Sequence, residues 1–189
     1  MNNPLHKKRP SLPDVEAWHR AVRGAIVPAG AQPPPTSRSR PWLGGRVIVV
    51  DTREQTPYFF PRQQVATLHT GDYSIVGMED LCCIGRKTLA DAWASIGSGC
   101  GKAFRERRER FRREWIRMAE MQYAAVVIEA TLAQLLRPQK RSQVDPSVVI
   151  GTYLGWSVRH RIPVFFAGDR AGGRAVTARL LIAFWEGHR

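Results

Sequence analysis

Cysteines and long apolar segments are scarce in this sequence. Its 189 residues include three cysteines, two of them adjacent (Cys82 and Cys83), and no pair has Cys-x-x-Cys spacing. An odd number without that spacing argues against a disulfide framework or a structural zinc site, and predicts buried thiols in a reducing compartment. No apolar run approaches the ~20 residues that span a bilayer, and the N-terminus lacks the apolar core of a secretory signal. We therefore expect an intracellular protein, in a cytoplasm, nucleoid or nucleus, with no membrane partner.

Acidic residues are also scarce relative to basic ones. The chain has 16 Asp and Glu against 29 Lys and Arg, which gives a net charge of +13. A charge this high favours a polyanionic partner, and DNA or RNA is the first candidate. The length suits one domain with a tail, and 43% hydrophobic residues are enough to bury a core.

The N-terminal part differs in composition from the rest. Residues 1–44 are predicted to form a basic, proline-rich tail, and residues 45–189 a folded domain. Within the tail, residues 12–26 place apolar side chains on one face of a short amphipathic helix. Such a helix docks on its own domain or recruits a protein partner. One hypothesis for the whole chain is therefore an interaction protein whose charge serves only nonspecific RNA contact.

Apolar periodicity predicts an α/β domain after the tail. Two of the predicted strands lie on either side of a turn at residues 69–72, and Gly172-Gly173 is expected to break the chain before the last helix. The predicted strands are residues 46–51, 65–68, 73–76, 81–85, 123–129 and 162–167, and the predicted helices are residues 89–96 and 102–121, a short one after Thr131, one from Pro146, and a C-terminal one ending near Glu186.

Charged side chains follow the apolar segments of the first half of this domain. Carboxylates at neighbouring strand ends can hold Mg²⁺, and a lysine beside them can orient water or stabilise charge on a phosphoryl group. The sequence therefore predicts a hydrolytic metal site. Its candidate residues are Asp51, Arg53 and Glu54 after the first strand, Asp72 in the turn, and Arg86 and Lys87 after residues 81–84.

The same residues form an ordered set of motifs. These are Asp51-Thr52-Arg53-Glu54, Gly71-Asp72-Tyr73, and Gly85-Arg86-Lys87 followed by Asp91. Together they resemble the XPF-type structure-specific nuclease domain, over about residues 45 to 189. The resemblance implies a restriction-endonuclease-like fold with a central mixed sheet flanked by helices. It also implies a metal-dependent DNA endonuclease acting on branched, flapped or partly single-stranded DNA, and it leaves a homodimer open.

The resemblance assigns roles to individual residues. Asp72 is expected to be the first metal ligand and Lys87 the catalytic lysine. Asp51 and Glu54 are further candidate ligands for Mg²⁺ or Mn²⁺. The supporting members of the catalytic set are Arg53, Glu54, Arg86 and Asp91.

One position departs from the family pattern. Gly85 stands where the family has the glutamate of Glu-Arg-Lys, which is expected to supply a metal-binding carboxylate. Three explanations are open at this point. The second carboxylate has moved, with Glu54, Asp51 or Glu79 replacing it; or the domain is a catalytically degenerate DNA-binding or scaffold module; or the sequence is an inactivated variant of an active enzyme.

The predicted helix at residues 102–121 is rich in arginine. Phe104, Phe111, Trp115 and Met118 share one face at helical spacing, and we expect that face to be core. The other faces carry mainly arginines, whose planar guanidinium groups match the geometry of phosphate. We expect this surface to follow a DNA backbone. Its candidate contacts are Lys102, Arg105, Arg108 and Arg112.

Overall fold

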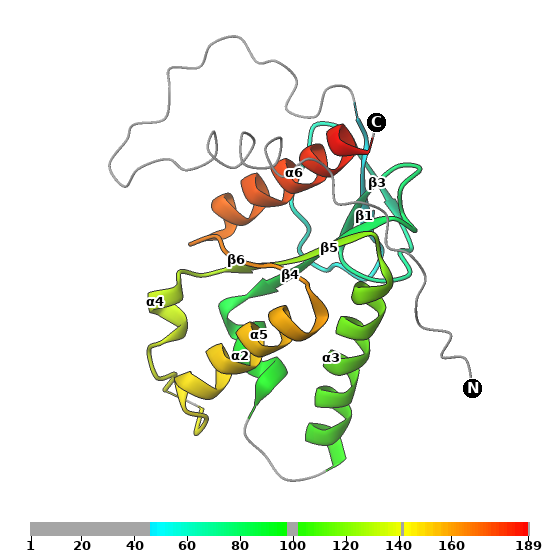
Figure 1. Cartoon of the computed structure of the whole chain (residues 1–189). Coiled ribbons are helices and arrows are strands. Elements are labelled where there is room, and N and C mark those ends of the chain that lie inside the picture. Colours follow the sequence, from blue (N-terminus) through cyan, green and yellow to red (C-terminus); the bar gives the residue numbers. More distant parts are fainter. Residues whose placement is uncertain (1–45, 98–101, 141, 189) are drawn as a thin grey trace, which may run out of the picture.

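The computed structural model describes residues 46–97, 102–140 and 142–188, and shows a sheet with helices on both faces (Figure 1). The predicted tail with its helix at residues 12–26 lies outside the described residues.

The described residues form one mixed six-stranded sheet in the order β2-β1-β3-β4-β5-β6. β1 is parallel to β2 and antiparallel to β3, β3 is antiparallel to β4, and β4, β5 and β6 run parallel. The predicted central mixed sheet is confirmed. Its strands are β1 (Ile48–Asp51), β2 (Gln63–Ala66), β3 (Tyr73–Ile75), β4 (Cys82–Thr88), β5 (Tyr123–Glu129) and β6 (Val164–Phe166).

The strands before and after the turn at residues 69–72 do not pair with each other. β2 and β3 instead lie on opposite sides of β1. β1 is buried along its whole length, so it takes the position between two neighbours. The turn between β2 and β3 brings Asp72 back to the end of β1, where the backbone N–H of Asp51 donates to the carbonyl oxygen of Asp72 at 2.9 Å.

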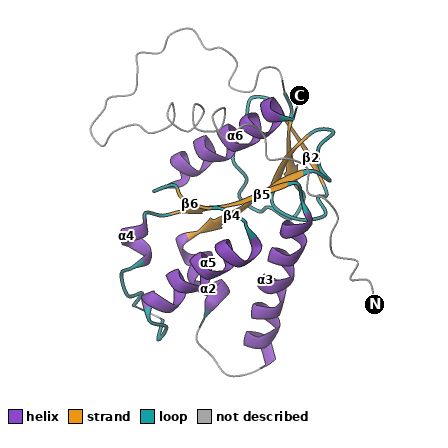
Figure 2. Ribbon diagram, in the orientation of Figure 1, coloured by secondary structure: helices purple, strands orange, loops and turns teal. Residues whose placement is uncertain are grey.

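Helices cover the sheet unequally (Figure 2). α2, α3 and α5 lie on one face and α6 on the other, while α4 follows the end of β5 (Figure 1). Each face has its own buried core, and β4 and β5 contribute side chains to both. The helices are α2 (Leu89–Ile96), α3 (Lys102–Glu120), α4 (Leu132–Leu135), α5 (Pro146–His160) and α6 (Arg170–Gly187).

The apolar face predicted for α3 is buried except at its N-terminal end. Phe111, Trp115 and Met118 are buried against the sheet and α5, as expected. Phe104 is only half-buried and lines a surface pocket. Four-residue spacing therefore identified the core side of the helix, but not the point at which the helix leaves the core.

The expectation that Gly172-Gly173 breaks the chain is wrong, because both glycines lie in the first turn of α6. Asp169 caps this helix and accepts a hydrogen bond from the backbone N–H of Gly172 at 2.7 Å. A Cβ on Gly172 would collide with the carbonyl oxygen of Ala167, and one on Gly173 with the Tyr58 hydroxyl. The two glycines do not interrupt the helix. They allow its first turn to pack closely against Ala167 and Tyr58.

The cysteines and the apolar character of the helices can be compared with the predictions made from composition. Cys82 and Cys83 are buried free thiols, as expected, and burial raises the pKa of both. Within the described part of the chain, no helix combines the length and apolar character that crossing a bilayer requires.

Candidate active site

β4 delivers two consecutive cations to opposite faces of the sheet. Successive side chains of a strand alternate between its faces, so Arg86 points toward the α6 side and Lys87 toward the α3 side. Their contacts define two groups. The Arg86 cluster consists of Arg86, Glu54, Thr56 and Glu129, and the Lys87 cluster consists of Lys87, Asp72 and Glu114.

Lys87 is held by a glutamate of α3. Its Nζ lies 3.2 Å from both carboxylate oxygens of Glu114, and the two side chains are 16% and 21% exposed. Burial alone would lower the pKa of Lys87, but the negative charges of Glu114, Asp72 and Asp91 outweigh it and hold the pKa above the ordinary value. Lys87 is therefore a charged ammonium group at neutral pH.

Asp72 is a largely buried carboxylate beside this ammonium. Its Oδ2 accepts a hydrogen bond from the backbone N–H of Arg86 at 2.6 Å. Burial raises the pKa of Asp72 to about 6; Lys87 and the Arg86 N–H oppose the rise, while the charges of Glu114 and Glu54 add to it. The negative charge of Asp72 is thus incompletely compensated, which favours a cation at this position.

The Arg86 cluster is more completely paired. Arg86 donates from Nε and Nη2 to the two oxygens of Glu129 at 2.8 and 3.0 Å, and from Nη1 to Glu54 Oε1 at 3.1 Å. The same Nη1 reaches the carbonyl and hydroxyl oxygens of Thr56. Arg86, Glu129 and Glu54 are 6%, 8% and 11% exposed. Forked, buried pairing of this kind joins the end of β4 to the end of β5 and to the loop after β1.

The carboxylate of Asp51 is engaged in holding its own loop. It accepts hydrogen bonds from the backbone N–H and the guanidinium of Arg53, and from the backbone N–H of Leu68 at 2.7 Å. Burial by itself raises its pKa, but these hydrogen bonds outweigh it, and the pKa of Asp51 lies below its ordinary value. Arg53 in turn donates to the Leu68 carbonyl oxygen. Asp51 and Arg53 are thus bonded to each other and to the backbone of Leu68, and they hold the loop after β1 in place.

Asp91 lies at the start of α2. Its carboxylate accepts a hydrogen bond from the Thr88 hydroxyl at 2.6 Å, and its backbone N–H donates to the same hydroxyl oxygen. Thr88 is the N-cap of the helix. Asp91 is exposed, and it acts on Lys87 through its charge.

Sequence reasoning missed Glu114 as a member of this site. Glu114 lies on an arginine-rich helix whose faces outside the apolar stripe were expected to be a charged surface. Its position three residues after Phe111 and four before Met118 places it beside the buried face of α3. That spacing was a usable signal, because it brings a carboxylate toward the sheet.

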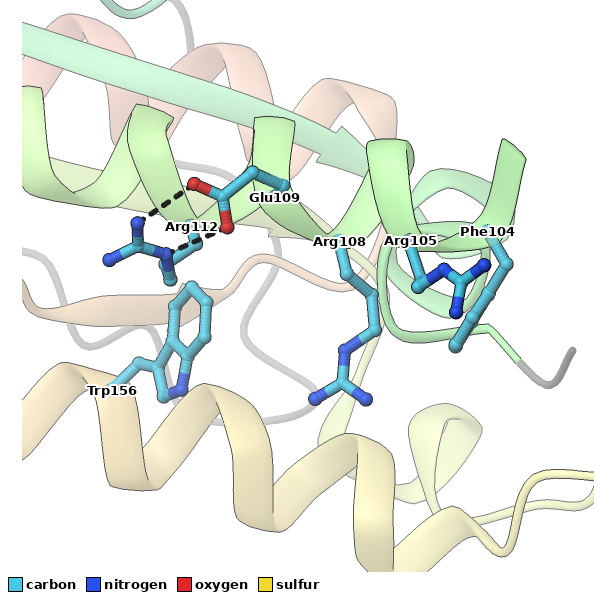
Figure 3. A pocket seen from close by; sticks show the side chains of 6 residues that line it. All are labelled: Phe104, Arg105, Arg108, Glu109, Arg112 and Trp156. Atoms are coloured by element: carbon cyan, nitrogen blue, oxygen red, sulfur yellow. Dashed lines mark hydrogen bonds and ion pairs between the residues drawn. The ribbon is translucent and has the colours of Figure 1, made fainter. Parts of the chain in front are cut away.

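A basic pocket lies beside the same helix and is lined by side chains of α3 and α5. Its volume is about 450 Å³. Figure 3 shows Arg108 extending from α3 toward α5 and the Trp156 indole rising from α5. Arg112 is paired with Glu109 at 2.8 and 2.9 Å. The lining residues are Phe104, Arg105, Arg108, Glu109, Arg112 and Trp156.

Phe111 connects the pocket to the Lys87 cluster. Its ring is stacked on Trp156 with centroids 5.0 Å apart, and Lys87 Nζ lies 5.9 Å from the same ring. Arg105, Arg108 and Arg112 lie on the same helix as Glu114, and the buried Phe111 ring contacts both Trp156 of the pocket and Lys87. Lys102 does not line the pocket; it lies at the exposed start of α3, 4.0 Å from Glu106.

The fold and the sequence of this chain are similar to those of known proteins. The fold is similar to that of XPF from Aeropyrum pernix, with a TM-score of 0.52, 18% identity, and coverage of 74% of this chain and 65% of that chain. A second structure, XPF from Aeropyrum pernix in complex with DNA, has a TM-score of 0.53 and 20% identity, and the match covers 76% of this chain and 66% of that chain. This chain thus spans just under two thirds of those chains. No curated protein matches it. The ERCC4 domain matches residues 50–180, which contain both charge clusters, and the chain belongs to the ERCC4 domain family.

Proposed function

We propose that this protein is a metal-dependent DNA endonuclease that hydrolyses phosphodiester bonds in branched, flapped or partly single-stranded DNA. The observation that carries the proposal is the Lys87 cluster, in which a largely buried ammonium, paired with Glu114 of the arginine-rich helix, lies beside the incompletely compensated carboxylate of Asp72. Membership of the ERCC4 domain family supports it.

Asp72 is the residue that would hold the cation, Mg²⁺ or Mn²⁺. Both are hard cations that prefer carboxylate oxygen, and Mg²⁺ is commonly bound by one or two carboxylates together with waters and substrate phosphates. Asp72 fits that pattern as one carboxylate donor, because its charge is incompletely compensated by Lys87 and the backbone N–H of Arg86. A bound divalent cation neutralises charge at phosphorus and lowers the pKa of a bound water.

Lys87 would act on the phosphate itself. Its charged ammonium can donate hydrogen bonds to a phosphate oxygen and stabilise the negative charge that develops there during hydrolysis. Glu114 holds Lys87 in one orientation at 3.2 Å. Arg86 would support the site indirectly, because its backbone N–H fixes Asp72 while its side chain points to the other face.

DNA would approach along α3. Arg105, Arg108 and Arg112 offer guanidinium groups to backbone phosphates, and Lys102 extends this row at the exposed start of the helix. The half-buried rings of Phe104 and Trp156 line the same pocket, and an unpaired base could stack on them. Such a pocket suits DNA with a single-stranded part better than a continuous duplex, whose bases are already stacked.

The direct test is cleavage of flap, hairpin and linear duplex DNA by the full chain with Mg²⁺, Mn²⁺ or EDTA. We expect metal-dependent cutting of the flap or hairpin and no cutting by Lys87→Ala. Cutting that persists in Lys87→Ala would place the chemistry at another site. A chain that binds DNA with a steep salt dependence and cuts with neither metal would instead be the catalytically degenerate module.

The DNA surface is tested separately by Arg108→Ala, with Arg110→Ala as the matched control on the opposite side of α3. Removing one phosphate contact should reduce the slope of log K against log salt by about 1. We expect that change for Arg108→Ala only, in fluorescence anisotropy titrations at several salt concentrations. Equal changes in both variants would mean that α3 binds DNA by its charge without using the pocket.

A homodimer and a protein partner bound through residues 1–44 are proposals from the sequence. Sedimentation equilibrium of the full chain, with and without flap DNA, tests the dimer. Deletion of residues 1–44 tests the partner: loss of the partner with unchanged DNA affinity would assign recruitment to this segment.

A further inference from the structure

Gly85 faces α3 from the middle of the candidate site. It precedes Lys87 by two residues on β4, so a side chain at position 85 would point to the same face of the sheet as the lysine. A Cβ built on Gly85 would lie 3.4 Å from Met118 Cε and 3.8 Å from Glu114 Oε1. These are ordinary van der Waals distances, so the glycine is not required by backbone crowding.

The space next to Gly85 already contains a carboxylate. Glu114 reaches it from α3, and both of its oxygens lie 3.2 Å from Lys87 Nζ. Its charge also acts on Asp72 and Lys87. A glutamate at position 85 would bring a second carboxylate into the same partly buried space, where two like charges repel each other strongly.

We propose that Glu114 of α3 supplies the second metal-binding carboxylate, replacing the glutamate that β4 lacks at Gly85. The inference rests on the proposed function for the metal itself, and it assigns a residue that the sequence motifs do not contain. In this arrangement the ligands of one cation come from the turn before β3, through Asp72, and from a helix, through Glu114. Gly85 leaves room for the longer reach of the α3 side chain.

The other carboxylates considered from the sequence are held away from Gly85, whereas Glu114, although its oxygens are paired with Lys87, lies 3.8 Å from a Cβ built there. Glu54 Oε1 accepts hydrogen bonds from Arg86 and from the backbone N–H of Thr56, and Asp51 is bonded to Arg53 and Leu68. Glu79 precedes β4 and acts through its charge on Cys82.

Cys82 is separated from Lys87 by five residues of extended chain, or roughly 16 Å at ~3.3 Å per residue. Glu79 therefore lies near the opposite end of β4 from Lys87. Of the carboxylates considered, Glu114 is the one in direct contact with Lys87.

The test compares wild type with Glu114→Gln, Gly85→Glu and the double variant, using the full chain. Mn²⁺ affinity is measured from the electron paramagnetic resonance signal of free Mn²⁺, without DNA. We expect Glu114→Gln to weaken Mn²⁺ binding about 10-fold or more, since loss of a ligand removes a charged oxygen donor. The double variant should recover most of that loss, because the carboxylate returns to the strand. Glu120→Gln, an exposed change on the same helix, should leave the affinity unchanged.

Glu114→Asp separates coordination from simple charge. It keeps the negative charge but shortens the side chain by one methylene, so a ligand role predicts weaker Mn²⁺ binding and a purely electrostatic role does not. Thermal unfolding of each variant without metal verifies that it is folded. Unchanged Mn²⁺ affinity in Glu114→Gln, or a double variant that binds no better than Glu114→Gln, would overturn the inference.

The two proposals fail in different ways. Mn²⁺ binding that depends on Asp72 and Glu114, without cleavage of any DNA, would remove the endonuclease proposal and leave the ligand assignment standing. Cleavage and Mn²⁺ binding that are both insensitive to Glu114→Gln would leave the endonuclease standing and remove the ligand assignment. Mn²⁺ binding that is the same in wild type and Asp72→Asn would overturn both metal assignments.

Discussion

Arg86 and Lys87 are neighbours in one motif, yet they belong to clusters of different character. The Arg86 cluster is enclosed, and its guanidinium is paired with two carboxylates whose side chains are 8% and 11% exposed. The Lys87 cluster is more open, with side chains 16% and 21% exposed, and it contains a carboxylate, Asp72, whose pKa is raised to about 6. The first cluster is arranged for stability, and the second retains the uncompensated charge that a ligand can use.

The difference follows from strand geometry. Side chains alternate between the faces of β4, so two adjacent cations meet different partners, one near α6 and one near α3. The motif therefore has two parts with different roles: Arg86 is the structural half, and Lys87 is the reactive half. Substitutions in each half of the motif test that division.

Lys87→Met should reduce the rate of DNA cleavage by about 10³-fold or more, which corresponds to about 4 kcal/mol in the activation barrier. The variant keeps the apolar length of the side chain that lies beside Phe111 and removes only the ammonium group. Single-turnover cleavage with saturating enzyme measures the effect, and DNA affinity serves as the control. A rate within threefold of wild type would show that the reactive half of the motif has been misassigned.

Arg86→Leu should instead reduce the free energy of unfolding, by about 3–5 kcal/mol, since it leaves the buried carboxylates of Glu129 and Glu54 without their partner. Urea unfolding at neutral pH measures this loss. Adding Glu129→Gln to Arg86→Leu should recover part of it, because one unpaired charge is removed. A loss under about 1 kcal/mol would mean that the enclosed cluster contributes little to stability.

Asp72→Asn should increase the free energy of unfolding at pH 8 by about 1–3 kcal/mol, from a pKa shift of about 2 units at 1.36 kcal/mol each. The folded-state pKa of about 6 lies above the ordinary value of 3.8, so Asp72 favours folding when protonated, below pH 4, and this contribution is lost as the pH rises through 6. Urea unfolding without metal should therefore show an advantage for the variant at pH 8 and none at pH 4. A variant that is less stable than wild type at pH 8 would contradict the idea of an uncompensated charge.

Gly85→Ala should change the free energy of unfolding by less than about 1 kcal/mol, because its Cβ meets Met118 and Glu114 only at van der Waals distance. Gly173→Ala is the contrasting case, since its Cβ would collide with the Tyr58 hydroxyl. Thermal unfolding of both variants should show a large loss for position 173 alone. A large loss at position 85 would mean that the approach of α3 to β4 requires glycine.

Much of the fold could be predicted from local patterns. The apolar residues of β5, the Thr88 cap of α2 and the Asp145-Pro146 start of α5 each have a signal within a few residues, and the structure confirms them. The order of the strands had no such signal. β2 and β3 are close in sequence, but each pairs with β1, and no local periodicity states which strands become neighbours.

The residues of the candidate site also differ in whether the sequence could identify them. Asp72 and Lys87 were found from motifs in one short segment of the chain, and the structure brings them into one electrostatic group. Glu114 lies 27 residues after Lys87 on a helix full of charges, where sequence alone did not distinguish it from surface ion pairs. Glu129 lies 43 residues after Arg86 at the end of β5, and no local pattern indicated that it is the partner of the arginine.

By itself, the sequence determined which segments are strands and helices, that the protein is basic, and that Asp72, Arg86 and Lys87 lie near neighbouring strand ends. These properties depend on short-range periodicity and on charge, and both can be read along the chain. The tertiary structure alone decided which partners Arg86 and Lys87 meet on the two faces, and that a carboxylate from α3 occupies the space above Gly85. The physical reason is that packing of a helix on a sheet brings together side chains from distant parts of the sequence, and no local pattern encodes that register.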